Sequence, residues 1–165
     1  CVFCPFLICG LSVMDSKKIV LASDHAGYRL KNIISSHISI NGHIVEDLGT
    51  DSVDPVDYPD FGHLAALELL KGNVDFGFIF CGTGIGISMA ANKHAGIRAA
   101  LCHSVETAMY ARAHNNANIL ALGERIIEVE LAKDCVSAFI NTPFEGGRHI
   151  NRINKINLPP IERLN

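Results

Sequence analysis

The chain has 165 residues, of which 48% are hydrophobic and 19% are charged, and its formal net charge is -3 at pH 7. This length suits one compact domain with a continuous core, and the apolar content favours an extensive interior or a subunit interface. The slightly acidic balance, with no basic run longer than Lys17-Lys18, lacks the positive surface of a nucleic-acid-binding protein, so we expect no nucleic acid as a partner.

The chain opens with an apolar run, CVFCPFLICGLSV at 1–13. This run is too short to span a bilayer and lacks the positive region of a secretory signal, so a signal-like anchor is the less favoured alternative. An orderly strand pattern begins only after Met14. We therefore interpret residues 1–16 as an N-terminal extension and residues 17–165 as a single domain that does not associate with membranes.

The six cysteines favour a reducing compartment. The first two form a CxxC unit, but a redox motif of that kind needs a strand before it and a helix after it. The other four have neither paired spacing nor a zinc-type pattern with histidine, and a chain of this length needs no disulfide framework. We expect a cytoplasmic protein.

From Lys18 onward, short apolar runs alternate with amphipathic stretches, which is the pattern of β-α-β units that build a parallel sheet. KIVLAS at 18–23 predicts a buried first strand, and residues 27–40 predict a helix. The apolar face of this helix is expected to hold Leu30, Ile33, Ile34 and Ile38.

A second short strand is predicted at 43–49, followed by a loop at 50–62 that is rich in aspartate and proline. Proline is favoured in the first turn of a helix, so the next helix is expected to begin near Pro59 or Asp60. Its inward-facing side chains are expected to be Phe61, Leu64 and Ala65.

The second half of the chain repeats the alternation. Apolar runs predict strands at 74–80, 96–102 and 117–123. Helices are expected at 85–94, from Ser104 as N-cap, at 128–140 and at 145–157. In the helix that starts after Ser104, one face is expected to hold Val105, Ala108, Met109 and Arg112. In the helix at 128–140, one stripe is expected to hold Ala132, Val136, Phe139 and Ile140. The fold class is therefore α/β, a Rossmann-like three-layer sandwich with a five-stranded parallel sheet.

The sequence CGTGIG at 81–86 follows the third predicted strand and precedes a helix. In open α/β sheets, ligands bind beyond the carboxyl ends of the strands, and backbone N–H groups at such a turn attract negative charge. A dinucleotide-binding fingerprint would need glycine at position 87, where the chain has Ile87, and the Gly-Lys-Ser/Thr of a Walker phosphate loop is absent. NAD or FAD binding is therefore an alternative with little support.

An oxyanion that develops during a reaction suits the loop better, with N–H groups of Gly82 to Gly86 and the Thr83 hydroxyl as donors. Cys81 would then be the reacting group, since a helix N-terminus can lower the usual thiol pKa of about 8.5. The alternative is that Cys81 is one more small buried apolar residue at a strand end.

Six separated motifs have to be read together: SDHAGYRLK at 23–31, DYPDF at 57–61, CGTGIGISMAANKHAGIRAA at 81–100, HNNAN at 114–118, LGERII at 122–127 and EGGRHINRI at 145–153. Together they closely resemble the type B ribose-5-phosphate isomerases, within the family that also holds galactose-6-phosphate isomerase. The match runs from about Lys17 to Leu158. The resemblance implies a reversible aldose to ketose conversion of a sugar phosphate through an enediolate, with no metal and no cofactor.

The resemblance also implies roles for single residues. Cys81 matches the base of the family, with Thr83 and the loop 82–86 as its oxyanion site. His114 matches the residue that opens the sugar ring, with Asp24 as its helper, and an imidazole with a usual pKa near 6.5 suits that task. Without the motif, His114 would equally fit a histidine at a helix end. In another subclass a glutamate further along the loop is the base, and Ile87 takes that position here.

The remaining matches are substrate-binding positions. Arg148 and Arg152 are four residues apart, so they project from one face of the last helix and match the phosphate ligands of the family. Without the motif, the two arginines would be a solvated face. The full set of expected substrate-binding residues is His25, Tyr58, Gly82, Gly84, Ile85, Gly86, Asn115, Arg125, Arg148 and Arg152. The other histidines, expected to be surface or packing residues, are His37, His43, His63, His94, His103 and His149.

In the family the site lies at a dimer interface, so the resemblance implies a homodimer, or a tetramer built from dimers. Small-molecule sugar phosphates are the expected partners. A fold never fixes an activity by itself, and a sugar-phosphate sensor on the same fold is the alternative from another functional class. A sensor would keep the arginines but would not need Cys81.

Overall fold

The computed structural model describes residues 15–156. Residues 1–14, which make up most of the predicted N-terminal extension, and residues 157–165 lie outside this range. The described elements, in chain order, are β1 (Lys18–Ser23), α1 (Tyr28–Ile40), β2 (Ile44–Asp47), α2 (Tyr58–Leu70), β3 (Phe76–Cys81), α3 (Ile85–Ala91), β4 (Ala99–Leu101), α4 (Val105–Ala113), β5 (Ile119–Gly123), α5 (Val129–Asn141) and α6 (Arg148–Ile156). The predicted alternation of strands and helices is confirmed.

The five strands form one parallel sheet in the order β2-β1-β3-β5-β4. The central strands β1, β3 and β5 are buried along nearly their whole length, as expected for continuous apolar runs in a parallel sheet. Their register pairs Ser23 with Phe80 and Cys81 with Gly123, so the carboxyl ends of these strands lie level. The strand order reverses between β1 and β3, which is where ligand sites form in such sheets.

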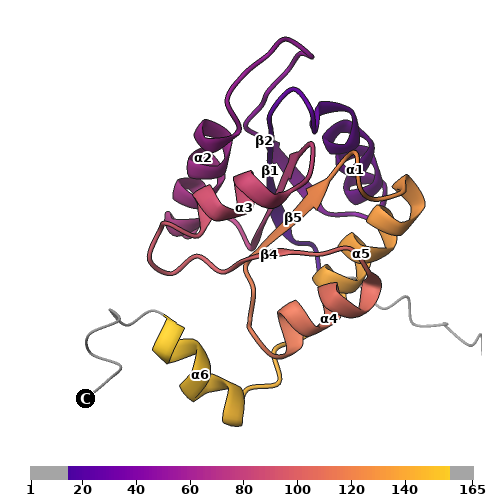
Figure 1. The fold of residues 1–165 in the computed structure, drawn as a ribbon. Helices are drawn as coiled ribbons and strands as arrows, with labels where there is room; N and C mark the ends of the chain where they lie inside the picture. The colour runs from indigo at the N-terminus through magenta and orange to yellow at the C-terminus, as the bar shows by residue number, and fades with distance from the viewer. Residues whose placement is uncertain (1–14, 157–165) are drawn as a thin grey trace, which may run out of the picture.

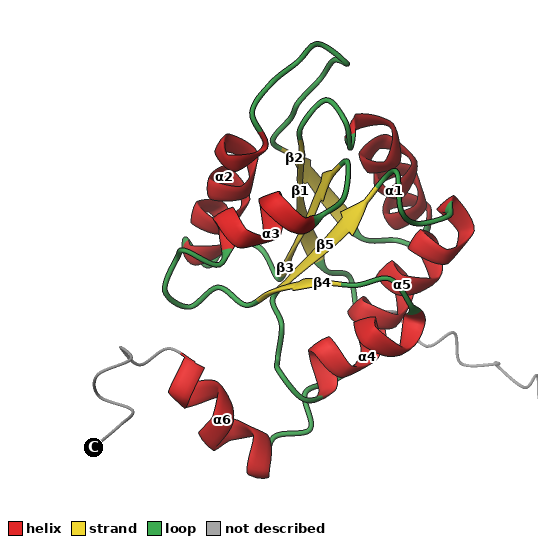
Figure 2. Ribbon diagram, in the orientation of Figure 1, coloured by secondary structure: helices red, strands yellow, loops and turns green. Residues whose placement is uncertain are grey.

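Helices cover both faces of the sheet, which confirms the three-layer architecture (Figure 1). α1, α4 and α5 enclose one apolar core with Phe78 and Phe139, and α2 and α3 enclose the other with Ile79 and Ile87. In Figure 2, α6 lies beyond α4 and away from both layers. Within residues 15–156, no helix is long and apolar enough to cross a membrane.

Leu64, which was predicted to face inward, is 45% exposed, so that prediction is wrong. Ile33, on the predicted apolar face of α1, is 37% exposed, and Met109 of α4 is 44% exposed. In α2 the covered face consists of small residues such as Ala65 and Ala66, so the helix lies close to the sheet and the covered stripe is narrow. Helical periodicity gives the direction of the covered face but not its width.

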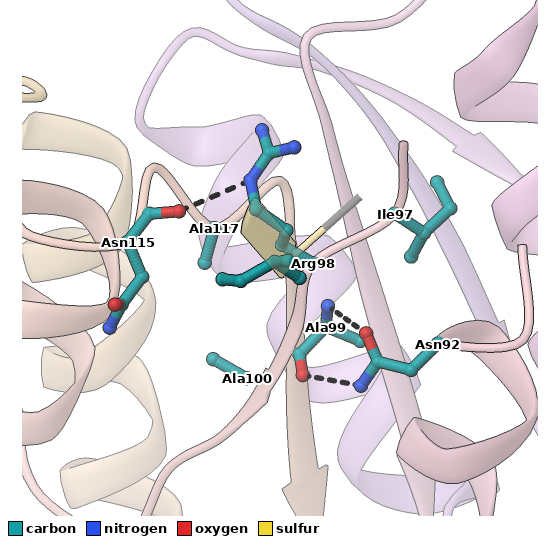
Figure 3. A pocket seen from close by; sticks show the side chains of 8 residues that line it. Asn92, Ile97, Arg98, Ala99, Ala100, Asn115 and Ala117 are labelled. Carbon is teal, nitrogen blue, oxygen red and sulfur yellow. Dashed lines mark hydrogen bonds between the residues drawn. The ribbon is translucent and has the colours of Figure 1, made fainter. Parts of the chain in front are cut away.

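The edge strand β4 is shorter than the predicted 96–102. Its outer side is occupied by the side chain of Asn92, which follows α3 (Figure 3). The amide of Asn92 donates to the carbonyl oxygen of Ala99 at 2.8 Å, and its oxygen accepts the N–H of Ala99 at 2.8 Å. A side chain therefore satisfies the outward-facing backbone groups of Ala99.

A buried lysine fixes the loop that follows β2. Lys31 is 1% exposed, and its ammonium donates to the carboxylate of Asp47 at 2.7 Å and to the carbonyl oxygen of Thr50 at 2.8 Å. The N–H of Thr50 in turn donates to the carbonyl oxygen of Ser23 at 2.7 Å. The last residue of β1 is therefore held in place immediately before Asp24.

Candidate active site

A pocket of about 250 Å³ lies at the carboxyl ends of β1 and β3. It is lined by Asp24, His25, Ala26, Tyr58, Cys81, Gly82, Thr83, Gly86 and Arg125. The structure thus brings together eight of the residues that the sequence singled out. Ala26 was not predicted, because its methyl group carries no chemical signal and only its position after His25 could have pointed to it.

Cys81 ends β3 at the wall of this pocket and is 4% exposed. The N–H of Gly84 donates to its sulfur, at an N to Sγ distance of 3.1 Å. The two other described cysteines lie in the apolar core away from this pocket. Burial raises the pKa of Cys102 to about 11 and that of Cys135 to about 11, so these thiols stay protonated at neutral pH. Among the described cysteines, Cys81 is the one that lines the pocket.

Two side chains lie directly on the backbone of the loop 82–86. A Cβ atom at Gly86 would come within 2.6 Å of the ring of Tyr58. A Cβ atom at Gly82 would come within 3.3 Å of the guanidinium group of Arg125. Glycine at these two positions therefore lets an aromatic ring and a cation approach the loop, and both side chains then line the pocket.

Gly84 is needed for the path of the loop itself. Its φ of +76° lies in the left-handed region, and a Cβ atom there would come within 2.5 Å of Leu101. We expect Gly84→Ala to lower the free energy of unfolding by about 3 kcal/mol. Urea unfolding followed by circular dichroism measures this change.

Gly72 provides the matched control for that measurement. Its φ of +79° is nearly the same, but nothing lies within 4 Å of the position of its Cβ atom. We expect Gly72→Ala to cost about 1 kcal/mol, which is the backbone penalty alone. Equal losses in the two variants would contradict the close packing of Gly84 against Leu101.

Asp24 and His25 follow β1 and form the opposite wall of the pocket. Asp24 is 5% exposed, and one of its carboxylate oxygens accepts the N–H groups of Ala26 at 2.9 Å and Gly27 at 3.0 Å. The Nδ1 atom of His25 lies 3.2 Å from the backbone nitrogen of Val56, which donates to it. Both side chains are therefore oriented by backbone groups of their surroundings.

Six of the predicted site residues do not line this pocket, and four of them lie elsewhere in the fold: His114, Asn115, Arg148 and Arg152. His114 caps the end of α4, and the two arginines are exposed on α6. Figure 1 shows α6 beyond α4, far from the loop between β3 and α3. One copy of the chain therefore does not bring Cys81, Asp24 and Thr83 together with His114 and the predicted phosphate ligands.

His114 lies in a group of polar and aromatic side chains. Its ring stacks between Tyr110, at a centroid distance of 4.8 Å, and His149, at 4.5 Å. The carboxylate of Glu145 lies 3.6 Å from the Nε2 atoms of both histidines. Burial, with the positive charges of His114, Arg148 and Arg152, lowers the pKa of His149. His149 is indeed a packing residue, but its neighbour is the predicted ring-opening histidine.

The ligand atoms of His114, Glu145 and His149 lie within 4.8 Å of one another. A metal ion must lie in the plane of each imidazole that binds it, and the two rings here are parallel to within 6°. Arg148 and Arg152 of α6 add positive charge beside His149. The arrangement suits an anion better than a cation, and we assign no metal to it.

Three further positions of the loop and of α3 do not line the pocket. Ile87 lies in α3 and is fully buried in the apolar core that α2 and α3 enclose. Ile85 is 47% exposed and does not line the pocket. Gly84 does not line it either, but contributes the N–H group that faces Cys81. The N–H of Ile85 donates to the Thr83 hydroxyl at 3.3 Å.

Comparison with protein families gives one match. The family model described as Ribose/Galactose Isomerase matches residues 19–156. The chain is 46% identical to ribose-5-phosphate isomerase B of Escherichia coli strain K12 over 140 residues, which cover 85% of the chain and 94% of that protein. It is also 46% identical to a probable ribose-5-phosphate isomerase B of Mycoplasma genitalium over 143 residues, covering 86% and 94%.

Solved structures share the fold at similar levels of identity. The ribose-5-phosphate isomerase B of Clostridium thermocellum superposes with a TM-score of 0.85 at 48% identity, covering 89% of this chain and 98% of that one. The structure from Mycoplasma genitalium, with bound ribulose-5-phosphate, has a TM-score of 0.82 at 43% identity and covers 90% and 97%. The predicted α/β fold class is therefore confirmed.

Proposed function

The chain belongs to the ribose/galactose isomerase family, and from this premise we propose that it interconverts ribose 5-phosphate and ribulose 5-phosphate through an enediolate. One observation carries the proposal: the sulfur of Cys81, the loop 82–86 and the carboxylate of Asp24 meet in one pocket at the switch point of the sheet. A thiol beside backbone donors is the pairing that proton transfer next to a carbonyl group requires.

Cys81 is the base of the proton transfer. It removes the proton from C2 of the open-chain aldose, the electron pair forms a double bond between C1 and C2, and negative charge develops on O1. N–H groups of the loop 82–86 and the hydroxyl of Thr83 stabilise that charge. Cys81 then returns the proton to C1, while the hydroxyl proton on O2 moves to O1, so that the carbonyl forms at C2. No step in this sequence uses a metal or a cofactor.

His114 prepares the substrate by opening its ring. In the cyclic form, the hydroxyl proton on O1 must leave and the ring oxygen must gain a proton as its bond to C1 breaks. His114 moves these protons, with the Asp24 carboxylate as its helper. The contact of His114 with Glu145 supports this role, because a carboxylate beside an imidazole stabilises the charged ring while it holds a proton.

The two halves of this machinery come from two copies of the chain. The pocket lies on one side of the protomer, whereas His114 and the exposed arginines of α6 lie on another. Large apolar side chains are exposed on α2, α3 and α4, as expected for a surface that a second copy covers; they are Leu64, Leu67, Leu70, Ile85, Met89, Met109 and Tyr110. We therefore propose a homodimer with its active sites at the interface. The described cysteines are free, which agrees with a reducing compartment.

Arg148 and Arg152 hold the phosphate, and His25, Asn115 and Arg125 contact the rest of the substrate. We expect Arg148→Ala to raise KM for ribose 5-phosphate roughly 10- to 100-fold, because it removes a charge-assisted hydrogen bond. Steady-state kinetics measure this change. Lys155→Ala, at the exposed end of the same helix, is the control and should leave KM unchanged. An unchanged KM for Arg148→Ala would mean that the phosphate binds elsewhere.

The test of the function is a direct assay. The protein is incubated with ribose 5-phosphate in the presence of a metal chelator, and ribulose 5-phosphate is measured; allose 6-phosphate and galactose 6-phosphate are compared under the same conditions. We expect turnover of ribose 5-phosphate. Binding of the sugar phosphate without turnover would support a sensor instead, and saturable micromolar binding of NAD or FAD would count against the proposal.

A further inference from the structure

The segment 114–118, which joins α4 to β5, contains the predicted site residues His114 and Asn115. An arginine side chain binds its backbone. The Nε atom of Arg98 donates to the carbonyl oxygen of Asn115 at 3.1 Å and to that of Asn116 at 2.9 Å. Figure 3 shows the bond from Arg98 to Asn115. A third bond runs from the same guanidinium group to the carbonyl oxygen of Gly96 at 3.3 Å.

A second guanidinium group, that of Arg112, binds Asn116 and Ala117 of the same segment. Arg112 donates to the side-chain oxygen of Asn116 at 2.8 Å and to the carbonyl oxygen of Ala117 at 2.6 Å. It packs over the rings of Phe76, at 4.8 Å, and Phe139, at 5.6 Å. Arg112 therefore belongs to the core, and its removal would disturb the whole domain.

These bonds fix the direction of the side chains. Three successive carbonyl oxygens, those of residues 115–117, accept from guanidinium groups, and Asn116 adopts a φ of +45° that few non-glycine residues adopt. With its carbonyls held inward, the segment leaves Asn115 exposed and His114 partly exposed. The arginines thus hold the loop in the conformation that presents the two predicted site residues.

Arg98 is placed differently from Arg112, which packs over two rings of the core. The side chain of Arg98 is partly buried, as that of Arg112 is, but it lines a pocket of about 230 Å³ between β4 and the end of α6, separate from the pocket of Cys81. Its backbone N–H donates to Asn118 at 2.8 Å, and its carbonyl oxygen accepts from Asn118 at 3.1 Å. These backbone bonds survive any replacement of the side chain.

We propose that Arg98 is a positioning residue for ring opening: its guanidinium group sets the place of His114 and Asn115 without touching the substrate. This inference rests on the proposed function. The fork of the guanidinium group lets one side chain bridge the carbonyls of Asn115, Asn116 and Gly96, which a single ammonium group on a flexible stem cannot reproduce with the same geometry.

The first experiment is the kinetics of Arg98→Met, which keeps the length of the side chain but removes its donors. We expect kcat for ribose 5-phosphate to fall roughly 10- to 100-fold, because small displacements of a catalytic group have effects of this size. KM should change less than about three-fold, since the phosphate ligands are on α6. The kcat of Arg98→Lys should lie between that of the wild type and that of Arg98→Met. The kcat of Arg29→Met, at an exposed arginine of α1, should match that of the wild type.

A double-mutant cycle with His114→Asn tests whether Arg98→Met lowers kcat by displacing His114 or by disturbing the protein in general. If Arg98 acts through His114, adding Arg98→Met to His114→Asn should lower kcat by less than about two-fold, whereas independent effects multiply. In a second measurement, free guanidinium at millimolar concentration should restore part of the kcat of Arg98→Ala, and sodium ions at equal ionic strength should not.

The outcomes separate this inference from the proposed function. A wild type without isomerase activity would refute the function itself, and a His114→Asn variant with normal kcat would refute the role of His114. An active wild type with multiplicative losses in the cycle, or a folded Arg98→Met variant with normal kcat, would refute the positioning role of Arg98 alone. Thermal unfolding of each variant establishes that it is folded, and Arg98→Lys replaces Arg98→Met if the latter is not.

Discussion

Cys81→Ala should lower kcat for isomerisation by on the order of 10³-fold, while the affinity for ribose 5-phosphate stays within a few-fold of the wild type. In the proposed mechanism, substrate binding and proton transfer fall to different residues. The arginines of α6 hold the phosphate and are left intact by the substitution, whereas Cys81, which lines the pocket, takes the C2 proton. Steady-state kinetics measure the first quantity and calorimetric titration the second.

Cys102→Ala is the matched control. This cysteine is also buried, and burial raises the pKa of its thiol to about 11, so it cannot serve as a base near neutral pH. We expect its replacement to leave kcat within about two-fold. A Cys81→Ala variant with near-normal turnover would overturn the assignment of the base. A variant that loses binding together with turnover would instead show that Cys81 maintains the shape of the pocket.

Two inactive variants should restore one another when they share a dimer. In a heterodimer of Cys81→Ala with His114→Asn, one of the two sites combines an intact pocket with an intact His114 from the other copy. Such heterodimers, isolated through two different affinity tags, should show about half of the wild-type activity. This follows because the chain itself keeps the two residues on different sides.

The control pairs two variants from the same half of the site. A heterodimer of Cys81→Ala with Asp24→Asn has one damaged pocket in each site, because both residues line the same pocket of their own copy. It should stay as inactive as its parents. If the pair with His114→Asn also stayed inactive, while sedimentation showed an intact dimer, then each site would be built within a single copy.

The sequence predicted the strands well because their signal is local. The runs at 19–22 and 119–122 are apolar throughout, and a parallel sheet buries such runs on both faces. The side of each helix that faces the sheet was also predictable, but the exposure of Leu64 was not. The width of the covered face depends on how closely the helix packs against the sheet. The spacing of apolar residues does not indicate that distance.

The sequence predicted which residues form the candidate site better than it predicted where they lie relative to one another. The pocket around Cys81 could be foreseen because residues that follow neighbouring parallel strands meet at one edge of the sheet. The separation of His114 from that pocket could not be predicted from the residues, because it depends on where α4 and α6 lie in space. The stacking of His149 on His114 and the bridge made by Arg98 left no sequence signal, because both residue types are common on surfaces.

The amide of Asn92 at the rim of the sheet has a consequence for how molecules of this protein can associate. An open strand edge invites another molecule to add a strand, which is how ordered aggregates grow. At Ala99 the donor and the acceptor that such an addition would use are already taken. The edge of β4 is therefore closed at Ala99 to the addition of a strand from another molecule.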